Sequence, residues 1–138
     1  MVKVGDFEVA KNLYYSKDWM WVKVEDGKVR IGVTDYAQKQ LREIVFAELP
    51  STGDQIMKGE TFGTLESVKS VSDLVAPVSG KVEETNNKVN KSPEILNKDP
   101  YGEGWILLVS PTGLENELKT LMNFEKAVEW HKELAKEG

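Results

Sequence analysis

Hydrophobic and polar residues alternate along much of the chain, and this alternation predicts strands in more places than helices. Valines and isoleucines alternate with polar residues on both sides of Asp26-Gly27, a pair typical of tight turns, so residues 21–33 are predicted to form a β-hairpin. Thr34 is suited to cap a short helix over 35–42, and a strand is predicted over 44–49. Between 53 and 84, short strands separated by glycine and proline turns indicate a small sandwich or barrel.

The second half of the chain adds helices to this pattern. Ser92-Pro93-Glu94 predicts a helix start with the serine hydroxyl as its cap, and residues 105–109 are predicted to form a last strand. Gly80 is expected to have a positive φ, in a turn at Ser79-Gly80-Lys81. Behind a capping Asn123, apolar positions recur at helical spacing and predict an amphipathic helix packed on the sheets. They are Phe124, Ala127, Val128, His131, Leu134 and Ala135.

Composition narrows the class of protein. The chain has 138 residues, 40% of them hydrophobic and 30% charged, which is typical of one globular domain. A net charge of −5 argues against a nucleic-acid partner, which usually selects a basic surface. No apolar run is long enough to span a membrane and the N-terminus lacks the core of a signal peptide, so we expect a cytoplasmic protein or a mature organellar form.

The chain offers little chemistry of its own. It has no cysteine, so no disulfide, thiol nucleophile or thiolate metal site is possible. His131 is the only histidine, and it is more simply explained as a packed residue of the terminal helix than as a member of a catalytic triad or metal site. The acidic residues have no spacing that singles out a general acid and base. We therefore expect no metal site and no enzyme activity.

Lys69 is the one lysine whose surroundings set it apart. If residues 62–68 and 70–76 pair as a hairpin, Val68 and Lys69 form the turn without the glycine, asparagine or aspartate that such turns usually need. The turn is therefore predicted to use ordinary right-handed backbone angles. Its small polar flanks, Ser67, Ser70 and Ser72, leave the lysine ammonium open to the active site of another protein. A modifying ligase would need such a lysine.

Four ordered blocks carry a resemblance to a known family. They are VTDYAQKQL at 33–41, IVFAELP at 44–50, GETFGTLESVKSVSDLVAPVSG at 59–80 and DPYGEGW at 99–105. From about residue 13 to 121 the chain resembles the H protein of the glycine cleavage system, in the lipoyl and biotinyl carrier superfamily. The resemblance implies a mainly β barrel-sandwich hybrid of two small antiparallel sheets, with short helices and a C-terminal amphipathic helix. One lipoyl-carrier domain would cover 1–138, with its core at about 13–112 and a helical segment at about 114–137.

The resemblance also implies a cofactor and partners. In the family the lysine of this turn carries lipoic acid in amide linkage, and Lys69 occupies its place; biotin carriers have methionines where Val68 and Ser70 stand. A lipoate ligase or octanoyltransferase would add the arm. A monomeric carrier would then pass an aminomethyl group from glycine decarboxylase to aminomethyltransferase, and dihydrolipoamide dehydrogenase would reoxidise the arm. The implied site comprises Glu66, Ser67, Val68, Lys69, Ser70 and Asp73.

One block departs from the family. The family reads T-x-x-H-E-W before its first core strand, whereas residues 16–21 read SKDWMW, so Trp21 matches but Trp19 and Met20 replace histidine and glutamate. In the family that glutamate lies beside the arm, which makes Trp19, Met20 and Trp21 the expected arm cleft. A thioether cannot neutralise an ammonium, although cation–π attraction to Trp19 and the charge of Asp73 could compensate.

This departure leaves a second function open. H-protein-like lipoate-binding proteins carry sulfur intermediates beside heterodisulfide-reductase-like complexes, and such cargo bears no ammonium. A soft apolar wall of Trp19 and Met20 suits sulfur cargo as well. Glycine cleavage stays first because the other blocks match, and an unmodified structural module is disfavoured by the intact lysine turn.

Overall fold

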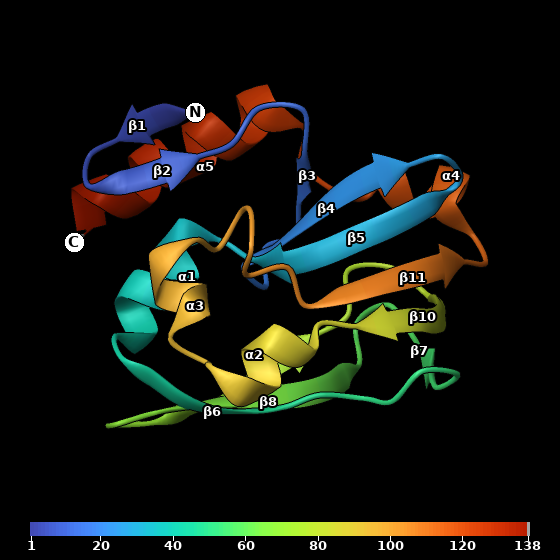
Figure 1. The fold of residues 1–138 in the computed structure, drawn as a ribbon. Helices are drawn as coiled ribbons and strands as arrows, with labels where there is room; N and C mark the ends of the chain where they lie inside the picture. The colour runs from blue at the N-terminus through green and yellow to red at the C-terminus, as the bar shows by residue number, and fades with distance from the viewer. Residues whose placement is uncertain (138) are drawn as a thin grey trace.

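Two antiparallel sheets face each other and a third, smaller one lies beside them. The structure is a computed structural model that describes residues 1–137. The six-stranded sheet has the order β3 (Tyr14–Tyr15), β4 (Met20–Glu25), β5 (Lys28–Val33), β11 (Leu107–Pro111), β10 (Gly80–Thr85) and β7 (Gln55–Ile56). The three-stranded sheet has the order β6 (Ile44–Glu48), β8 (Thr61–Ser67) and β9 (Val71–Val75). The third sheet pairs β1 (Val2–Val4) with β2 (Phe7–Val9) (Figure 1).

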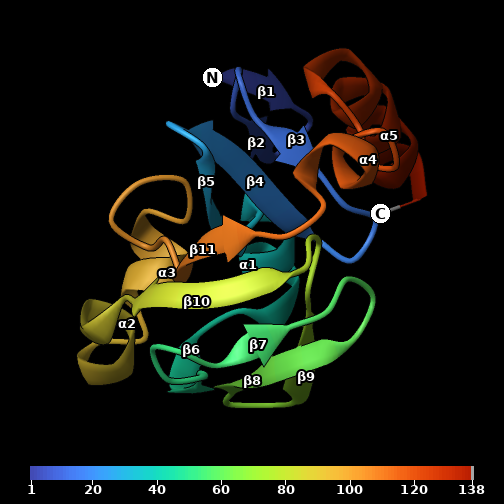
Figure 2. The same cartoon turned by 90° about the vertical axis from the view of Figure 1, so that its right-hand side faces the viewer.

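The main hydrophobic core lies between the two larger sheets, which form the two layers seen in Figure 2. Val22, Ile31 and Leu107 from the six-stranded sheet and Leu65 and Leu74 from the three-stranded sheet are almost completely buried there. Each strand supplies alternate residues to this layer because successive side chains point to opposite faces. The mainly β sandwich with flanking helices is confirmed.

The hairpin predicted over residues 21–33 forms as β4 and β5. Asp26 and Gly27 connect the strands with φ of 48° and 80°, the two positive angles that a type I′ turn requires. Because that turn matches the twist of the strands, it sets the register in which Val22 faces Ile31 and Met20 faces Val33. These local signals were sufficient to predict the element.

Within residues 1–137, five helices flank the sheets: α1 (Asp35–Leu41), α2 (Asn87–Lys91), α3 (Ile95–Lys98), α4 (Leu114–Leu118) and α5 (Phe124–Glu137). Thr34 caps α1 as predicted, since its hydroxyl accepts a hydrogen bond of 3.2 Å from the Ala37 amide. The predicted cap at Ser92 is wrong. Ser92 instead ends α2, because its amide donates to the Lys88 carbonyl at 2.8 Å, and α3 begins after Glu94 without a side-chain cap.

The predicted turn at Gly80 is also wrong. Gly80 is the first residue of β10 and pairs with both Ile56 and Pro111, and it is not among the glycines with positive φ. Glycine is needed there for lack of space: a Cβ would lie 2.3 Å from the Ser110 carbonyl oxygen and 2.7 Å from a Val109 methyl carbon. The close approach of the neighbouring strand explains this glycine.

The C-terminal helix packs on a second hydrophobic core. Asn123 caps α5 as predicted, with its Oδ1 2.9 Å from the Lys126 amide. The buried face of α5 lies over β1, β2 and β3 rather than over the main sandwich (Figure 1). The third sheet and this separate core were not predicted from the sequence. The core contains Val4, Val9, Ala10, Leu13, Tyr15, Trp21 and Ala127.

Candidate functional site

The turn that carries Lys69 is held by a buried serine. In the lysine hairpin, formed by β8, residues 68–70 and β9, the Ser67 amide donates to the Ser70 carbonyl at 2.8 Å. The Ser67 hydroxyl oxygen accepts from the amides of Lys69 at 3.3 Å and Ser70 at 3.1 Å. Neither Val68 nor Lys69 has a positive φ, as predicted. The Ser67 hydroxyl thus supports a turn that lacks the usual glycine or asparagine.

Lys69 itself projects from the molecule. It is exposed, and no residue among 1–137 forms a hydrogen bond or ion pair with its Nζ. The Val68 amide donates to the Glu43 carbonyl at 3.2 Å, which ties the turn to the segment before β6. The Lys69 side chain is therefore exposed on a turn whose backbone is held by hydrogen bonds to Ser67 and to Glu43.

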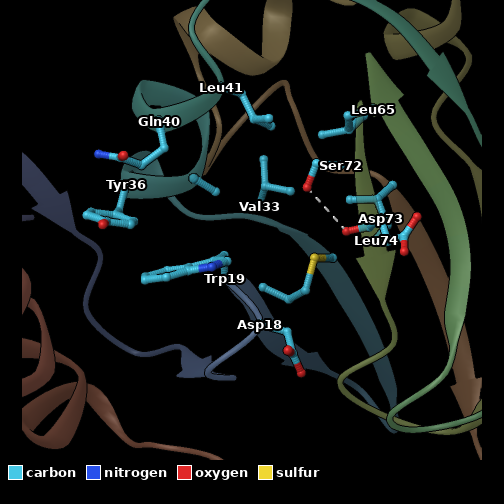
Figure 3. Close-up of a pocket in the computed structure, with 12 residues that line it drawn as sticks. Asp18, Trp19, Val33, Tyr36, Gln40, Leu41, Leu65, Ser72, Asp73 and Leu74 are labelled. Atoms are coloured by element: carbon cyan, nitrogen blue, oxygen red, sulfur yellow. Dashed lines mark hydrogen bonds between the residues drawn. The ribbon is translucent and has the colours of Figure 1, made fainter. Parts of the chain in front are cut away.

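A pocket of about 280 Å³ lies beside the lysine hairpin (Figure 3). We call it the hairpin pocket. One side comes from the segment entering β4, with Asp18, Trp19 and Met20. The opposite sides come from α1, with Tyr36 and Leu41, and from the lysine hairpin itself, with Leu65, Ser72, Asp73 and Leu74. Apolar side chains form most of the wall, and the residues from β9 lie only three to five positions after Lys69.

The structure brings two of the three expected cleft residues together. Trp19 and Met20 line the hairpin pocket, whereas Trp21 does not. Because neighbouring strand residues point to opposite faces, Trp21 belongs to the second core, where its indole N–H donates to the Pro100 carbonyl at 2.9 Å. Met20 is 1% exposed, so a thioether occupies the position where a carboxylate was expected from the resemblance.

Trp19 has an unusual backbone conformation, and its ring stacks on both Tyr36 and Trp130. Its backbone has φ of 73°, in the left-handed region that non-glycine residues rarely adopt. The ring centroid of Trp19 lies 4.3 Å from that of Tyr36 and 4.6 Å from that of Trp130, with interplanar angles of 23° and 16°. These stacking partners occupy the π-faces that a cation would need, which contradicts the suggested cation–π role. The contribution of Trp130, from α5, was not predicted.

The carboxylates of the pocket come from Asp18 and Asp73, which are both exposed and lie at its mouth. Asp73 was expected at the site, whereas Asp18 was not singled out. Its signal in the sequence is its position directly before the Trp19-Met20 pair. The hairpin pocket thus has an apolar interior and two negative charges where it opens to solvent.

A lysine on a tight hairpin at the end of a two-sheet β sandwich defines the fold of a lipoyl carrier. The family profile described as "Glycine cleavage H-protein" matches residues 13–134. The chain is 50% identical over 135 residues to the "Probable glycine cleavage system H protein" of Pyrococcus abyssi, covering 97% of this chain and 100% of that protein. The chain therefore belongs to the glycine cleavage H-protein family.

Two further comparisons agree with this assignment. The "Glycine cleavage system H protein" of Coprothermobacter proteolyticus is 53% identical over 120 residues, covering 86% of this chain and 94% of that protein. The crystal structure of a glycine cleavage system H protein from Mycobacterium marinum superposes with a TM-score of 0.80 at 34% identity, covering 88% of this chain and 98% of that one. No helix within residues 1–137 is long and apolar enough to cross a membrane.

Proposed function

We propose that this protein carries lipoic acid on Lys69 and shuttles the aminomethyl group of glycine from glycine decarboxylase to aminomethyltransferase, after which dihydrolipoamide dehydrogenase reoxidises the arm. In this role the protein is a carrier and not an enzyme. The observation that carries the proposal is the hairpin pocket, which is lined by both strands of the hairpin whose turn exposes Lys69. Family membership supports lipoic acid as the covalent group.

The residues present fit an arm of this kind. The long aliphatic chain and dithiolane of lipoic acid are apolar, and Leu65, Leu74 and Met20 offer an apolar interior to receive them. When bound, the dithiolane supplies the redox-active sulfurs that this cysteine-free chain lacks. The pocket walls would exclude water from the end of the arm, and the braced turn would limit the positions from which the arm enters.

Charge at the mouth suits an aminomethyl cargo. The cargo bears an ammonium, and Met20 provides no counter-charge within the pocket. Asp18 and Asp73 place two carboxylates at the opening instead. Because both are exposed, each is expected to contribute only about 0.2–1 kcal/mol to holding a cation, and that contribution weakens with salt.

A second candidate is carriage of sulfur intermediates on the same arm. The buried thioether of Met20 and the stacked indole of Trp19 give the interior a soft apolar wall, and this observation favours uncharged sulfur cargo. Glycine cleavage remains the preferred function because the carboxylates of Asp18 and Asp73 would have no role toward a neutral cargo.

Modification of Lys69 is tested by mass. Incubation with a lipoate ligase, ATP and lipoate should add one lipoyl group to the peptide containing Lys69. The Lys69→Arg variant should gain none, while Lys81→Arg, a matched change at an exposed strand lysine, should behave as the wild type. Addition of the group to Lys69→Arg would overturn the assignment.

Cargo is tested on the fully lipoylated protein by glycine-dependent carboxyl exchange with glycine decarboxylase and by the half-life of the aminomethyl adduct. In Asp18→Asn/Asp73→Asn, loss of two exposed charge contacts should shorten the half-life by about 2- to 30-fold at low salt. High salt should shorten the wild-type half-life in the same direction. A lipoylated wild type that accepts no aminomethyl group would exclude glycine cleavage and favour the sulfur cargo.

A further inference from the structure

Four exposed apolar side chains gather around the tip of the lysine hairpin. Among residues 1–137, seven large hydrophobic side chains are exposed, and four of them lie on β6, on β9 or in the turn between β8 and β9. We call this group the tip patch. It consists of Val45, Phe46, Val68 and Val71, which are 51%, 50%, 68% and 62% exposed.

Strand register explains why these residues share a face. Phe46 pairs with Glu66, and Glu66 pairs with Val71, so the three side chains form one row across the three-stranded sheet. The register shifts between Ile44 and Phe46, and this bulge leaves Val45 exposed next to Phe46 instead of returning it to the core. In the part of the chain that the structure describes, no helix covers this outer face of β6, β8 and β9 (Figure 2).

Carboxylates surround the tip patch. Glu66 lies within the row, Glu48 lies two positions from Phe46 on the same strand face, and Glu43 lies just before β6. All three are exposed, and none forms an ion pair with another residue among 1–137. The nearby basic residues in the sequence are Arg42 and Lys69 itself. An apolar surface with free acidic groups matches a partner that has an apolar groove bordered by basic side chains.

Among the proposed partners, one must approach Lys69 at its own Nζ atom. To form the amide, the ammonium at Nζ loses one proton to solvent and the resulting amine attacks an activated acyl carbonyl; the nitrogen then loses a second proton, to solvent or to the departing group. The C–N bond forms, and the leaving group, an adenylate or a carrier thiol, departs with the electron pair of the bond that breaks. The acylating enzyme must therefore cover the hairpin tip. Enzymes that act later meet the far end of a long arm and do not need to contact the tip.

We infer that the tip patch is the docking surface for the enzyme that acylates Lys69, and that this enzyme binds it through an apolar groove bordered by basic side chains. The inference rests on the proposed function, because it requires Lys69 to be the acylated residue. Phe46 and Val71 lie at the two ends of the central row, so they are the anchors of the contact.

The test compares acylation kinetics of patch and control variants. Phe46→Ala/Val71→Ala should lower kcat/KM for lipoylation by a lipoate ligase at least about tenfold, mainly through KM, as expected when interface anchors are truncated. Met57→Ala, which removes a side chain of similar exposure away from the tip, should stay within about twofold of the wild type. Melting temperatures should show that both variants remain folded.

Electrostatics gives a second readout. Raising the salt concentration should lower the wild-type kcat/KM, and Glu43→Gln/Glu48→Gln should lose most of that salt dependence. Equal kcat/KM for the wild type and the patch variant would show that the tip patch is not the docking surface, while Lys69 would remain the modified residue. Normal lipoylation of the patch variant combined with lost carboxyl exchange would assign the surface to the decarboxylase. Concentration-dependent dimerisation abolished by the patch variant would assign it to a second copy of the chain.

A wild-type protein that gains no lipoyl group would overturn the proposed function itself, and the docking inference with it. The wild type measured beside the patch variant separates that outcome from a failure of docking, because a wild type that is lipoylated keeps the proposed function whatever the patch variant does.

Discussion

Removing the Trp130 side chain is expected to open the hairpin pocket, although Trp130 does not line it. Trp130 stacks on Trp19, which forms one wall of the pocket. An aromatic pair contributes about 0.5–1.5 kcal/mol beyond the area it buries. Trp19 also has φ of 73°, and a backbone held in such a region costs about 1–3 kcal/mol. The Trp19 amide donates to the Ser16 carbonyl at 3.2 Å and the Trp19 carbonyl accepts from the Thr34 amide at 2.9 Å, so the main chain should keep this conformation. Losing one stacking partner is therefore expected to loosen the Trp19 ring rather than its backbone.

The assay is a double-mutant cycle on the free energy of unfolding. Trp130→Ala is expected to destabilise the protein by about 2 kcal/mol, less than the 3–5 kcal/mol of a fully buried aromatic residue, because Trp130 is only half-buried. Combined with Trp19→Ala, it should show a coupling energy of about 0.5–1.5 kcal/mol. Urea unfolding followed by circular dichroism supplies all four values.

Function gives the discriminating readout. In the lipoylated Trp130→Ala variant, a mobile Trp19 should shorten the half-life of the aminomethyl adduct. The rate of lipoylation should not change, since α5 packs on β1, β2 and β3 and not on the lysine hairpin. Trp130→Phe, which keeps a ring, should recover most of the half-life. Additive unfolding energies, within about 0.3 kcal/mol, together with an unchanged half-life would refute the coupling between α5 and the pocket.

Two further predictions concern the stability of the fold that supports the hairpin pocket. Gly80→Ala should destabilise the protein by more than about 1 kcal/mol, because the new Cβ would lie 2.3 Å from the Ser110 carbonyl oxygen. The control Gly113→Ala should not, because the nearest atom to its new Cβ lies at 3.9 Å. Equal melting temperatures for the two variants would contradict this prediction. Burial lowers the pKa of His131 below its ordinary value of about 6.5, although the nearby Asp35 carboxylate acts in the opposite direction. His131 therefore binds a proton more readily in the unfolded chain than in the folded protein. The free energy of unfolding should fall as the pH drops below about 6.5. His131→Leu should show a smaller fall in urea unfolding between pH 7.5 and 5.5, and identical pH profiles would count against this role for the buried imidazole.

The sequence determined the elements whose signals are local. The Asp26-Gly27 turn, the Thr34 cap and the Asn123 cap each depend on residues within a few positions, so they could be predicted and were confirmed. The Lys69 turn was also located from its neighbours, within one residue of the observed strand ends. Local rules failed at Gly80, because glycine there meets a steric demand from β11 rather than a turn requirement.

Only the tertiary structure decided what surrounds the lysine hairpin. Alternation along β4 predicts that Met20 and Trp21 point to opposite faces, but packing against α1 and the second core decided that Met20 lines the pocket and Trp21 does not. The short strands β1 and β2 carry too few residues to show a period, so the strands beneath the predicted apolar face of α5 had no sequence signal. The stack of Trp130 on Trp19 joins residues from distant parts of the chain. Such contacts follow from how whole faces bury apolar area together, which no local pattern of residues records.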